Sequence, residues 1–395
     1  MSRTIVPHPS SGVYSPSVTC FNQVIFVSGQ LGCQNLTPDS TFTDECRAAL
    51  ESLQQVLIQS NSSLSLATMC TIYLTDINSY SEFNLVYQEM LTQTNAASAP
   101  PCRACFAIQA LPLGGRVEIE CEAVTSTAAS TRKVLVPGVP NLFSAAVTGG
   151  SDQMVWVAGQ LSFKDGALHG TNITEQADGA IDCLDSVLST AGTSLSALVR
   201  TTVFLTNMNQ YGPMNEVYGT KLNLTNSQSG QPPTRAAFCV KDLPLNGIIE
   251  ISAVCASNPD LNTIQSGLSA SPVYSPAVTT GTSCKMVWVS GQVALDANSG
   301  TKVLVGAGDV SKETLQAMTN MKNVLEKSGS DMKHVLKVNI YCADMNDYSL
   351  INEVYASFFG VDSPPARACV QVKELPLKAR VEVCCVAIEV QQSSM

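Results

Sequence analysis

The sequence lacks the long apolar runs and the clustered basic residues that mark two large classes of protein. Its 395 residues contain no uninterrupted apolar stretch near the roughly 18–20 residues that a membrane-spanning helix needs, so we expect no membrane protein. Lys and Arg number 22 against 32 Asp and Glu, a net charge of −10, and the basic residues form no cluster. A nucleic-acid backbone repels such a chain, so we expect no nucleic-acid partner.

A targeting signal and the common catalytic motifs are also missing. The N-terminal stretch MSRTIVPHPSSG has neither an apolar core nor the Arg-rich pattern of a transit peptide, which predicts a cytoplasmic protein with reduced thiols among its 15 cysteines. The chain has only His8, His169 and His334, and it contains no HExxH, GxSxG or Walker-type phosphate loop. These absences exclude much of the common list of enzymes.

What the sequence does contain is a domain-sized repeat. Three segments align: SAPPCRACFAIQALPLGGRVEIE, QPPTRAAFCVKDLPLNGIIEIS and SPPARACVQVKELPLKARVEVC. Their arginines lie 132 residues apart, and a glutamate follows each after 15 positions; these residues are Arg103, Arg235, Arg367, Glu118, Glu250 and Glu382. A period of this length is that of a whole domain. We therefore predict three domains, residues 1–127, 128–258 and 259–395, with linkers at about 126–140 and 256–272.

Each repeat has the same predicted order of elements. In the first, a β-rich run ends in a glycine turn, and apolar residues between Cys46 and Leu57 then follow helical spacing. A strand, a second helix from Tyr80 to Tyr87 and two alternating strands complete the repeat. Two helices for one sheet indicate the α+β class.

The recurring arginine and glutamate each allow two interpretations. Every arginine follows a stiff Pro-Pro dipeptide and precedes an apolar strand, where its planar guanidinium fits a carboxylate, although a structural ion pair would also explain it. The glutamate is either a solvated residue on a strand face or a buried carboxyl that positions and deprotonates water. The residues alone leave both questions open.

The cysteines and histidines do not form the patterns of a metal site or a redox-active dithiol. Cys102 and Cys105 form a CxxC pair, but only the second cysteine recurs, at Cys369, and no partner pair completes a Cys₄ zinc site. The histidines do not recur between the repeats either. We therefore predict no metal site.

The third repeat resembles the RidA/YjgF family of reactive-intermediate (enamine/imine) deaminases at YSPAV, WVSGQ, INEVY, SPPARACVQVKELP and VEV. The first repeat resembles this family through YSPSV, IFVSGQ, FNLVY, PPCRACFAIQALP and VEIE, and the middle repeat does so more weakly. The resemblance implies a chorismate-mutase-like domain that normally forms a homotrimer, with sheets inward, helices outside and ligand clefts between subunits. For this chain it implies a covalent pseudo-trimer that needs no second chain.

The resemblance also implies roles for particular residues. The carboxylate-binding arginine corresponds to Arg103, Arg235 and Arg367, and the glutamate that handles water to Glu118, Glu250 and Glu382. The resemblance implies a catalytic role for Tyr14 and Tyr274 in the cleft. It implies substrate binding by Ser28, Gly29, Ser290 and Gly291 in the glycine turn, by Asn84 and Asn352 on the second helix, and by Cys105 and Cys369. The helix asparagine also recurs as Asn215. In the middle repeat Phe143, Ala158 and Ala237 replace the tyrosine, serine and cysteine. We therefore expect one or two competent sites, not three.

The activity implied is hydrolysis of 2-aminoacrylate, 2-aminocrotonate and related 2-imino acids to 2-keto acids and ammonia, with no metal or organic cofactor. One alternative is a non-catalytic protein that binds or senses small carboxylates or keto acids. Another is the endoribonuclease and translation-inhibitor activity attached to the family's older name, against which the acidic charge argues.

Overall fold

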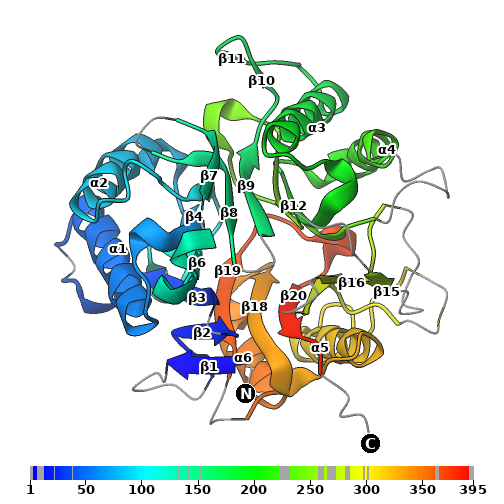
Figure 1. The fold of residues 1–395 in the computed structure, drawn as a ribbon. Helices are drawn as coiled ribbons and strands as arrows, with labels where there is room; N and C mark the ends of the chain where they lie inside the picture. Colours follow the sequence, from blue (N-terminus) through cyan, green and yellow to red (C-terminus); the bar gives the residue numbers. More distant parts are fainter. Residues whose placement is uncertain are drawn as a thin grey trace, which may run out of the picture.

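A computed structural model describes residues 3–6, 13–21, 23–37, 39–131, 133–139, 142–150, 154–222, 232–256, 262–264, 273–280, 285–296, 299, 302–360 and 364–390. In this part of the chain, three α+β units surround a common centre, each with a six-stranded mixed sheet and two α-helices on one face of it (Figure 1). The α+β prediction is confirmed. None of the described helices is both long and apolar enough to cross a membrane.

The first unit has the sheet order β1-β2-β3-β6-β4-β5. Its elements are β1 (Arg3–Val6), β2 (Ser17–Cys20), β3 (Val24–Leu31), α1 (Phe42–Gln59), β4 (Ala67–Leu74), α2 (Tyr80–Gln93), β5 (Cys102–Ala107) and β6 (Val117–Val124). Strand β5 runs parallel to β4, and the remaining pairs are antiparallel. The sequence analysis found the order from β3 to β6 but not the hairpin of β1 and β2.

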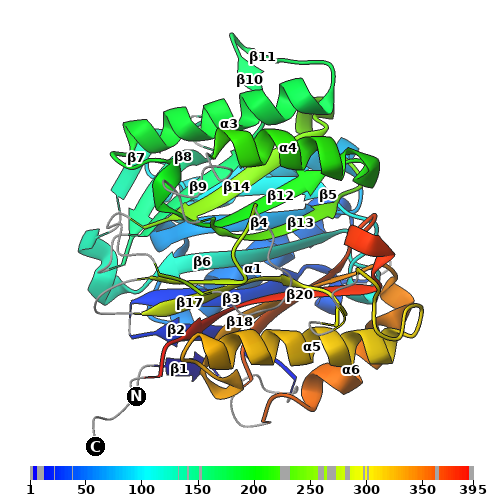
Figure 2. The same ribbon diagram turned by 90° about the vertical axis from the view of Figure 1, so that its right-hand side faces the viewer.

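The second unit repeats this sheet, in the order β13-β12-β14-β9-β8-β7. Its elements are β7 (Lys133–Pro137), β8 (Ser144–Gly149), β9 (Met154–Gln160), α3 (Ile173–Thr190), β12 (Leu198–Leu205), α4 (Tyr211–Lys221), β13 (Thr234–Cys239) and β14 (Ile249–Cys255). A two-stranded hairpin of β10 (Phe163–Lys164) and β11 (Ala167–Leu168) projects after β9 (Figure 2). Strand β7 lies in the segment expected to be a linker.

The third unit has the order β15-β16-β17-β20-β18-β19. Its elements are β15 (Asn262–Ile264), β16 (Ala277–Thr280), β17 (Met286–Gln292), α5 (Val310–Lys327), β18 (Val335–Cys342), α6 (Tyr348–Ala356), β19 (Ala366–Gln371) and β20 (Val381–Ile388). Strand β15 again lies in a segment expected to be a linker. The described parts of both segments therefore supply edge strands to the sheet that follows.

The helices cover the outer face of each sheet, as the apolar spacing predicts. Thr41 and Asp44 form a capping box that starts α1, and Cys46, Leu50 and Leu53 on its inner face are buried against the sheet. Helices α3 and α5 bury the corresponding faces of the other units. Figures 1 and 2 show the helices on the outside of the molecule and the strands within.

The inner faces of the three sheets share one apolar core. An aromatic belt runs through it, in which Phe106 and Phe204 lie 4.2 Å apart between ring centroids, and Phe238 and Tyr341 lie 4.0 Å apart. These contacts cross from the first unit to the second and from the second to the third. The chain is therefore an intramolecular pseudo-trimer, and each unit buries its inner face against the other two.

A buried polar cluster makes the centre of the pseudo-trimer asymmetric. Lys337 Nζ lies 3.1 Å from a Glu120 oxygen, and Arg200 Nη2 lies 3.0 Å from a Glu122 oxygen. The first unit thus supplies both carboxylates, and the other two units supply the cations. Because the strand register places Met69 where the other units have Arg200 and Lys337, the three units are not interchangeable around the centre.

Candidate active site

Each recurring arginine is buried at the start of an edge strand and held by its own unit. Arg103, Arg235 and Arg367 are each 4% exposed. Arg103 donates to Asn84 Oδ1 at 2.6 Å and to the Tyr80 hydroxyl at 2.7 Å. Because each side chain is fixed by helix residues, its guanidinium is held rigidly rather than moving in solvent.

The other two arginines have related surroundings with one difference. Arg367 donates to Asn352 Oδ1 at 2.5 Å and to the Tyr348 hydroxyl at 2.9 Å. Arg235 donates to the Tyr211 hydroxyl at 3.0 Å, but its Nη1 has no hydrogen-bond partner among the described residues. Asn84 and Asn352 therefore hold the guanidinium groups, whereas Asn215 Oδ1 has no hydrogen-bond partner among the described residues. The sequence analysis had expected Asn84 and Asn352 to bind substrate.

Aromatic residues of the next unit cover the guanidinium groups. The Tyr14 ring lies 5.1 Å from the Arg367 guanidinium carbon, and Tyr274 lies 5.1 Å from that of Arg235. Phe143 takes the same place at 5.3 Å from Arg103. Burial raises the pKa of Tyr14, and it raises the pKa of Tyr274 to about 12, so both phenols keep their protons at neutral pH.

The repeated glutamates also face the arginine of the preceding unit. One cavity of about 710 Å³ is lined by Arg103 and Glu250, and another of about 700 Å³ by Arg235 and Glu382. The charge of Arg367 acts on Glu118 across the third junction. We name the two cavities the Arg103 cleft and the Arg235 cleft, and we call the equivalent set of residues at the third junction the Arg367 cleft. Each cleft is therefore shared by two units, a pairing that the repeats alone had left open.

Backbone contacts fix the two units of each cleft in register. The Ser15 N–H donates to the Pro365 carbonyl at 3.0 Å, just ahead of Arg367. The corresponding bonds at the other junctions run from Ser144 to the Pro101 carbonyl at 3.1 Å and from Ser275 to the Pro233 carbonyl at 2.9 Å. The stiff proline segment before each arginine thus docks on the strand that follows the cleft aromatic residue.

The glutamates are deeply buried, and burial favours the protonated form of their carboxyls. Each is 3% exposed. Burial raises the pKa of Glu250 and of Glu382 to about 8, against the opposing charges of Arg103 and Arg235. Burial, with the neighbouring Glu120, raises the pKa of Glu118 well above its usual value. Such carboxyls can give a proton at neutral pH and later take one back.

The glycine of each turn leaves room for the glutamate. A Cβ atom at Gly29 would lie 1.7 Å from Glu118 Oε1, and at Gly291 it would lie 1.9 Å from Glu382 Oε1. Gly159 stands in the same relation to Glu250, at 1.7 Å. This close approach explains why glycine recurs in all three copies of the turn.

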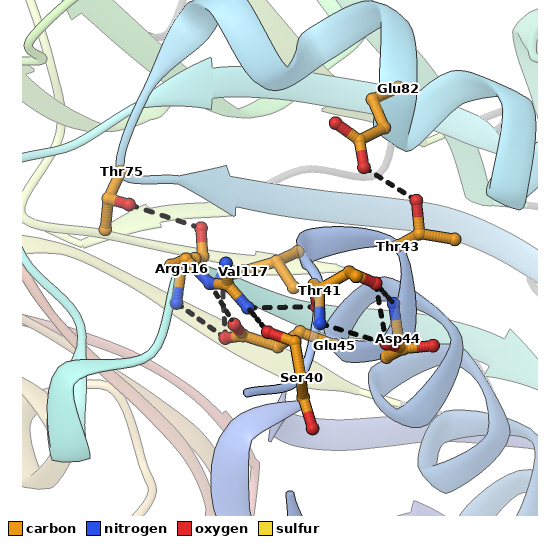
Figure 3. A network of polar contacts seen from close by, with 9 residues as sticks. All are labelled: Ser40, Thr41, Thr43, Asp44, Glu45, Thr75, Glu82, Arg116 and Val117. Atoms are coloured by element: carbon orange, nitrogen blue, oxygen red, sulfur yellow. Dashed lines mark hydrogen bonds and ion pairs between the residues drawn. The ribbon is translucent and has the colours of Figure 1, made fainter. Parts of the chain in front are cut away.

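A helix residue that the sequence analysis missed anchors the glutamate strand. Glu45, in the first turn of α1, accepts hydrogen bonds from the backbone N–H of Arg116 at 2.6 Å and of Val117 at 3.3 Å (Figure 3). Gln176 and Glu313 do the same in the other units, for the N–H two residues before the glutamate, at 3.0 and 2.8 Å. The recurrence of Glu, Gln and Glu at one helix position was the signal available in the sequence.

The turn serines are occupied at the junctions between units. Ser28 is fully buried; its hydroxyl donates to the Ser15 carbonyl at 2.5 Å and accepts from the Arg367 N–H at 2.8 Å. Ser290 donates to the Ser275 carbonyl at 2.6 Å and accepts from the Arg235 N–H. Both hydroxyls therefore position an arginine strand, where the sequence analysis expected them to bind substrate.

The substitutions in the middle unit fall on two of the three clefts. The Arg103 cleft has Phe143 and Ala158 in place of the tyrosine and serine, and the Arg235 cleft has Ala237 in place of the cysteine. Burial raises the pKa of Cys105, in the Arg103 cleft, to about 12, so it is a neutral thiol. Among the described residues, the Arg367 cleft alone unites every side chain of the expected set: Arg367, Cys369, Asn352, Tyr14, Ser28, Gly29 and Glu118.

The described residues contain no group of three or more His, Cys, Asp or Glu side chains that could hold a metal ion.

Comparisons with known proteins agree with this repeat structure. The family model described as Endoribonuclease L-PSP matches residues 6–125, 136–257 and 264–389. A 2-iminobutanoate/2-iminopropanoate deaminase of Dermatophagoides farinae is 42% identical over 123 residues, which cover 30% of this chain and 90% of that protein. A RutC family protein of Pyrococcus horikoshii is 38% identical over 110 residues, 28% of this chain and 82% of that protein. A chorismatase crystal structure matches 82% of this chain and 93% of its own with a TM-score of 0.55; at 14% identity, this shows likeness of fold alone.

Proposed function

The chain belongs to the RidA/YjgF family, and on that premise we propose that it is a hydrolytic deaminase of reactive enamines and imines. The substrates are 2-aminoacrylate, 2-aminocrotonate and related 2-imino acids, and the products are 2-keto acids and ammonia. The observation that carries the proposal is the convergence of the complete residue set in the Arg367 cleft. A relative at 42% identity bears the name of this activity.

Substrate binding falls to Arg367. Two of the five guanidinium N–H groups are occupied by Asn352 and Tyr348, which leaves donors for a carboxylate. A charge-assisted contact of this kind contributes about 1.5–3 kcal/mol. Binding of the carboxylate by Arg367 orients the substrate's C2 and C3 atoms toward Glu118, which belongs to the other unit of the cleft.

We assign the proton transfers to Glu118, whose raised pKa favours a protonated carboxyl before reaction. Its proton goes to C3 of the enamine, which becomes the iminium cation. The resulting carboxylate takes a proton from a water molecule as the water oxygen bonds to C2. Glu118 then gives this proton to the amino group of the carbinolamine, and ammonia leaves as the C2–N bond breaks. The hydroxyl proton passes to the Glu118 carboxylate, which leaves the keto acid and restores the protonated carboxyl. Since imines hydrolyse unaided, general acid–base help of about 10²–10⁴-fold is sufficient.

A second candidate function is binding of small carboxylates without turnover. The substitutions in the Arg103 and Arg235 clefts favour it for those two clefts, since a binding site tolerates the loss of a hydroxyl or a thiol. For the endoribonuclease activity named in the family description, the chain's net charge of −10 is unfavourable.

The test is pyruvate release from L-serine by a pyridoxal-phosphate serine dehydratase, with and without this protein. Arg367→Lys should remove most of the acceleration, because an ammonium group cannot reproduce the planar fork. Arg103→Lys and Arg235→Lys are matched controls and should retain most of it. No acceleration by the unmodified protein, or full acceleration by Arg367→Lys, would contradict the proposal.

A further inference from the structure

We propose that the Arg103 cleft is a separate binding site for monocarboxylates that carry a bulky apolar side chain, such as an aromatic or branched 2-oxo or 2-imino acid. The proposal rests on the proposed function in one assumption, namely that the buried arginine binds a carboxylate. It assigns this cleft a ligand class different from that of the Arg367 cleft.

The carboxylate end of the Arg103 cleft is intact. Asn84 and Tyr80 hold Arg103 as Asn352 and Tyr348 hold Arg367. The cleft therefore keeps a rigid, buried cation with free N–H donors.

The groups that would serve a small polar substrate are lost from the same cleft. Phe143 covers Arg103 in place of a tyrosine and removes a hydroxyl from the cleft. Ala158 replaces the serine of the glycine turn. Phe143 lines the cleft, so its missing hydroxyl favours apolar ligand atoms there, whereas Ala158 lacks only the hydroxyl that positions the arginine strand at the other two junctions.

The outer part of the cleft is apolar and exposed. Val139, Phe163 and Leu245 line it and are 47%, 46% and 59% exposed. Phe163 comes from the β10–β11 hairpin, which among the described residues has no counterpart in the other units. Exposed apolar side chains gathered around one buried cation fit a ligand with a carboxylate at one end and an apolar group at the other.

The Arg235 cleft supplies a comparison within the same molecule. It has nearly the same volume, about 700 Å³ against 710 Å³. Its lining includes Lys302 and Glu216, whereas the described lining of the Arg103 cleft has no charged side chain besides Arg103 and Glu250. Leu377 lines the Arg235 cleft as Leu245 lines the Arg103 cleft, so the two clefts differ in the charges of Lys302 and Glu216 and in Phe163 of the β10–β11 hairpin.

The experiment is calorimetric titration of the full chain with 3-phenylpropanoate and with propanoate. We expect 3-phenylpropanoate to bind at least tenfold more tightly. Arg103→Lys should abolish this binding and Arg367→Lys should leave it, with folding checked by circular dichroism. Phe163→Ser, on the exposed hairpin, should weaken 3-phenylpropanoate at least threefold and leave propanoate unchanged.

Equal affinity for the two acids, or loss of binding in Arg367→Lys rather than in Arg103→Lys, would overturn the proposal. The dehydratase assay separates it from the proposed function. Phe163→Ser should keep full deaminase acceleration, so deaminase activity without selective binding contradicts this inference alone. Selective binding without acceleration contradicts only the proposed function.

Discussion

Replacement of Gly29 by alanine displaces Glu118, the proposed proton carrier, without removing a polar group. The φ angle of Gly29 is not positive, so alanine is compatible with the backbone and only space is at issue. A Cβ atom there would lie 1.7 Å from Glu118 Oε1, where real Cβ contacts do not fall below 3.0 Å. The Glu118 carboxyl must therefore move by about 1.3 Å or more.

That displacement sets the size of the expected effect. A misplacement of about 1 Å in a catalytic group costs on the order of 10²-fold in rate. We expect Gly29→Ala to lower kcat/KM for enamine hydrolysis about 100-fold. The thermal unfolding midpoint should change far less than for a core truncation, because nothing is removed from the core.

The assay is the coupled dehydratase reaction, measured beside a thermal melt of each variant. Gly291→Ala is the matched control, since its Cβ would lie 1.9 Å from Glu382 in the Arg235 cleft. It imposes the same strain on a different cleft and should keep most of the activity. Full activity of a folded Gly29→Ala, or an equal loss in Gly291→Ala, would refute the reasoning.

Two further predictions concern stability. Because burial raises the pKa of Glu250 and Glu382 from 4.5 to about 8, the stability they contribute is full below about pH 4.5 and is lost as the pH rises through 8. In melts at several pH values, the double variant Glu250→Gln/Glu382→Gln should therefore lose less stability than wild type between pH 5 and 8, and parallel curves would disprove this. Lys337→Met removes the ion-pair partner of the buried Glu120 carboxylate. In denaturant titration, this variant should lower the free energy of unfolding by about 3–5 kcal/mol. Adding Glu120→Gln should restore part of that loss, and a cost below about 1 kcal/mol for the single variant would contradict the account.

The outer half of each unit could be predicted from the sequence. The spacing of Cys46, Leu50 and Leu53 in the first helix is the period of an amphipathic helix, and these residues are buried in the structure. The strands β3 to β6 alternate or carry continuous apolar runs, so they too were found. Local periodicity is enough to predict an element that packs on the sheet of its own unit.

The edge strands could not be predicted in the same way. Strand β2 has four residues and β15 has three, too few to establish an alternation. Strand β7 lies in a segment whose Ser, Pro and Gly content is typical of a linker. Pairing with the rest of the sheet decides the conformation of such segments.

The composition of the clefts depends on contacts between units. The 15-residue spacing from Arg103 to Glu118 left open which units share a site, and in the structure Arg103 shares its cleft with Glu250. The pairing follows from the docking of Pro365 on Ser15 and its two equivalents, which no local pattern encodes. For the same reason the hydrogen bond that Ser28 accepts from the Arg367 N–H across a unit boundary was not foreseen.

The most direct test of the account compares kcat/KM of the three single variants Glu118→Gln, Glu250→Gln and Glu382→Gln in the dehydratase assay. These residues are equally buried, so differences in activity report the cleft in which each lies. The account predicts a loss of about 10²–10⁴-fold for Glu118→Gln and retention of most activity by the other two. Equal losses in all three variants, or an unimpaired Glu118→Gln, would contradict it.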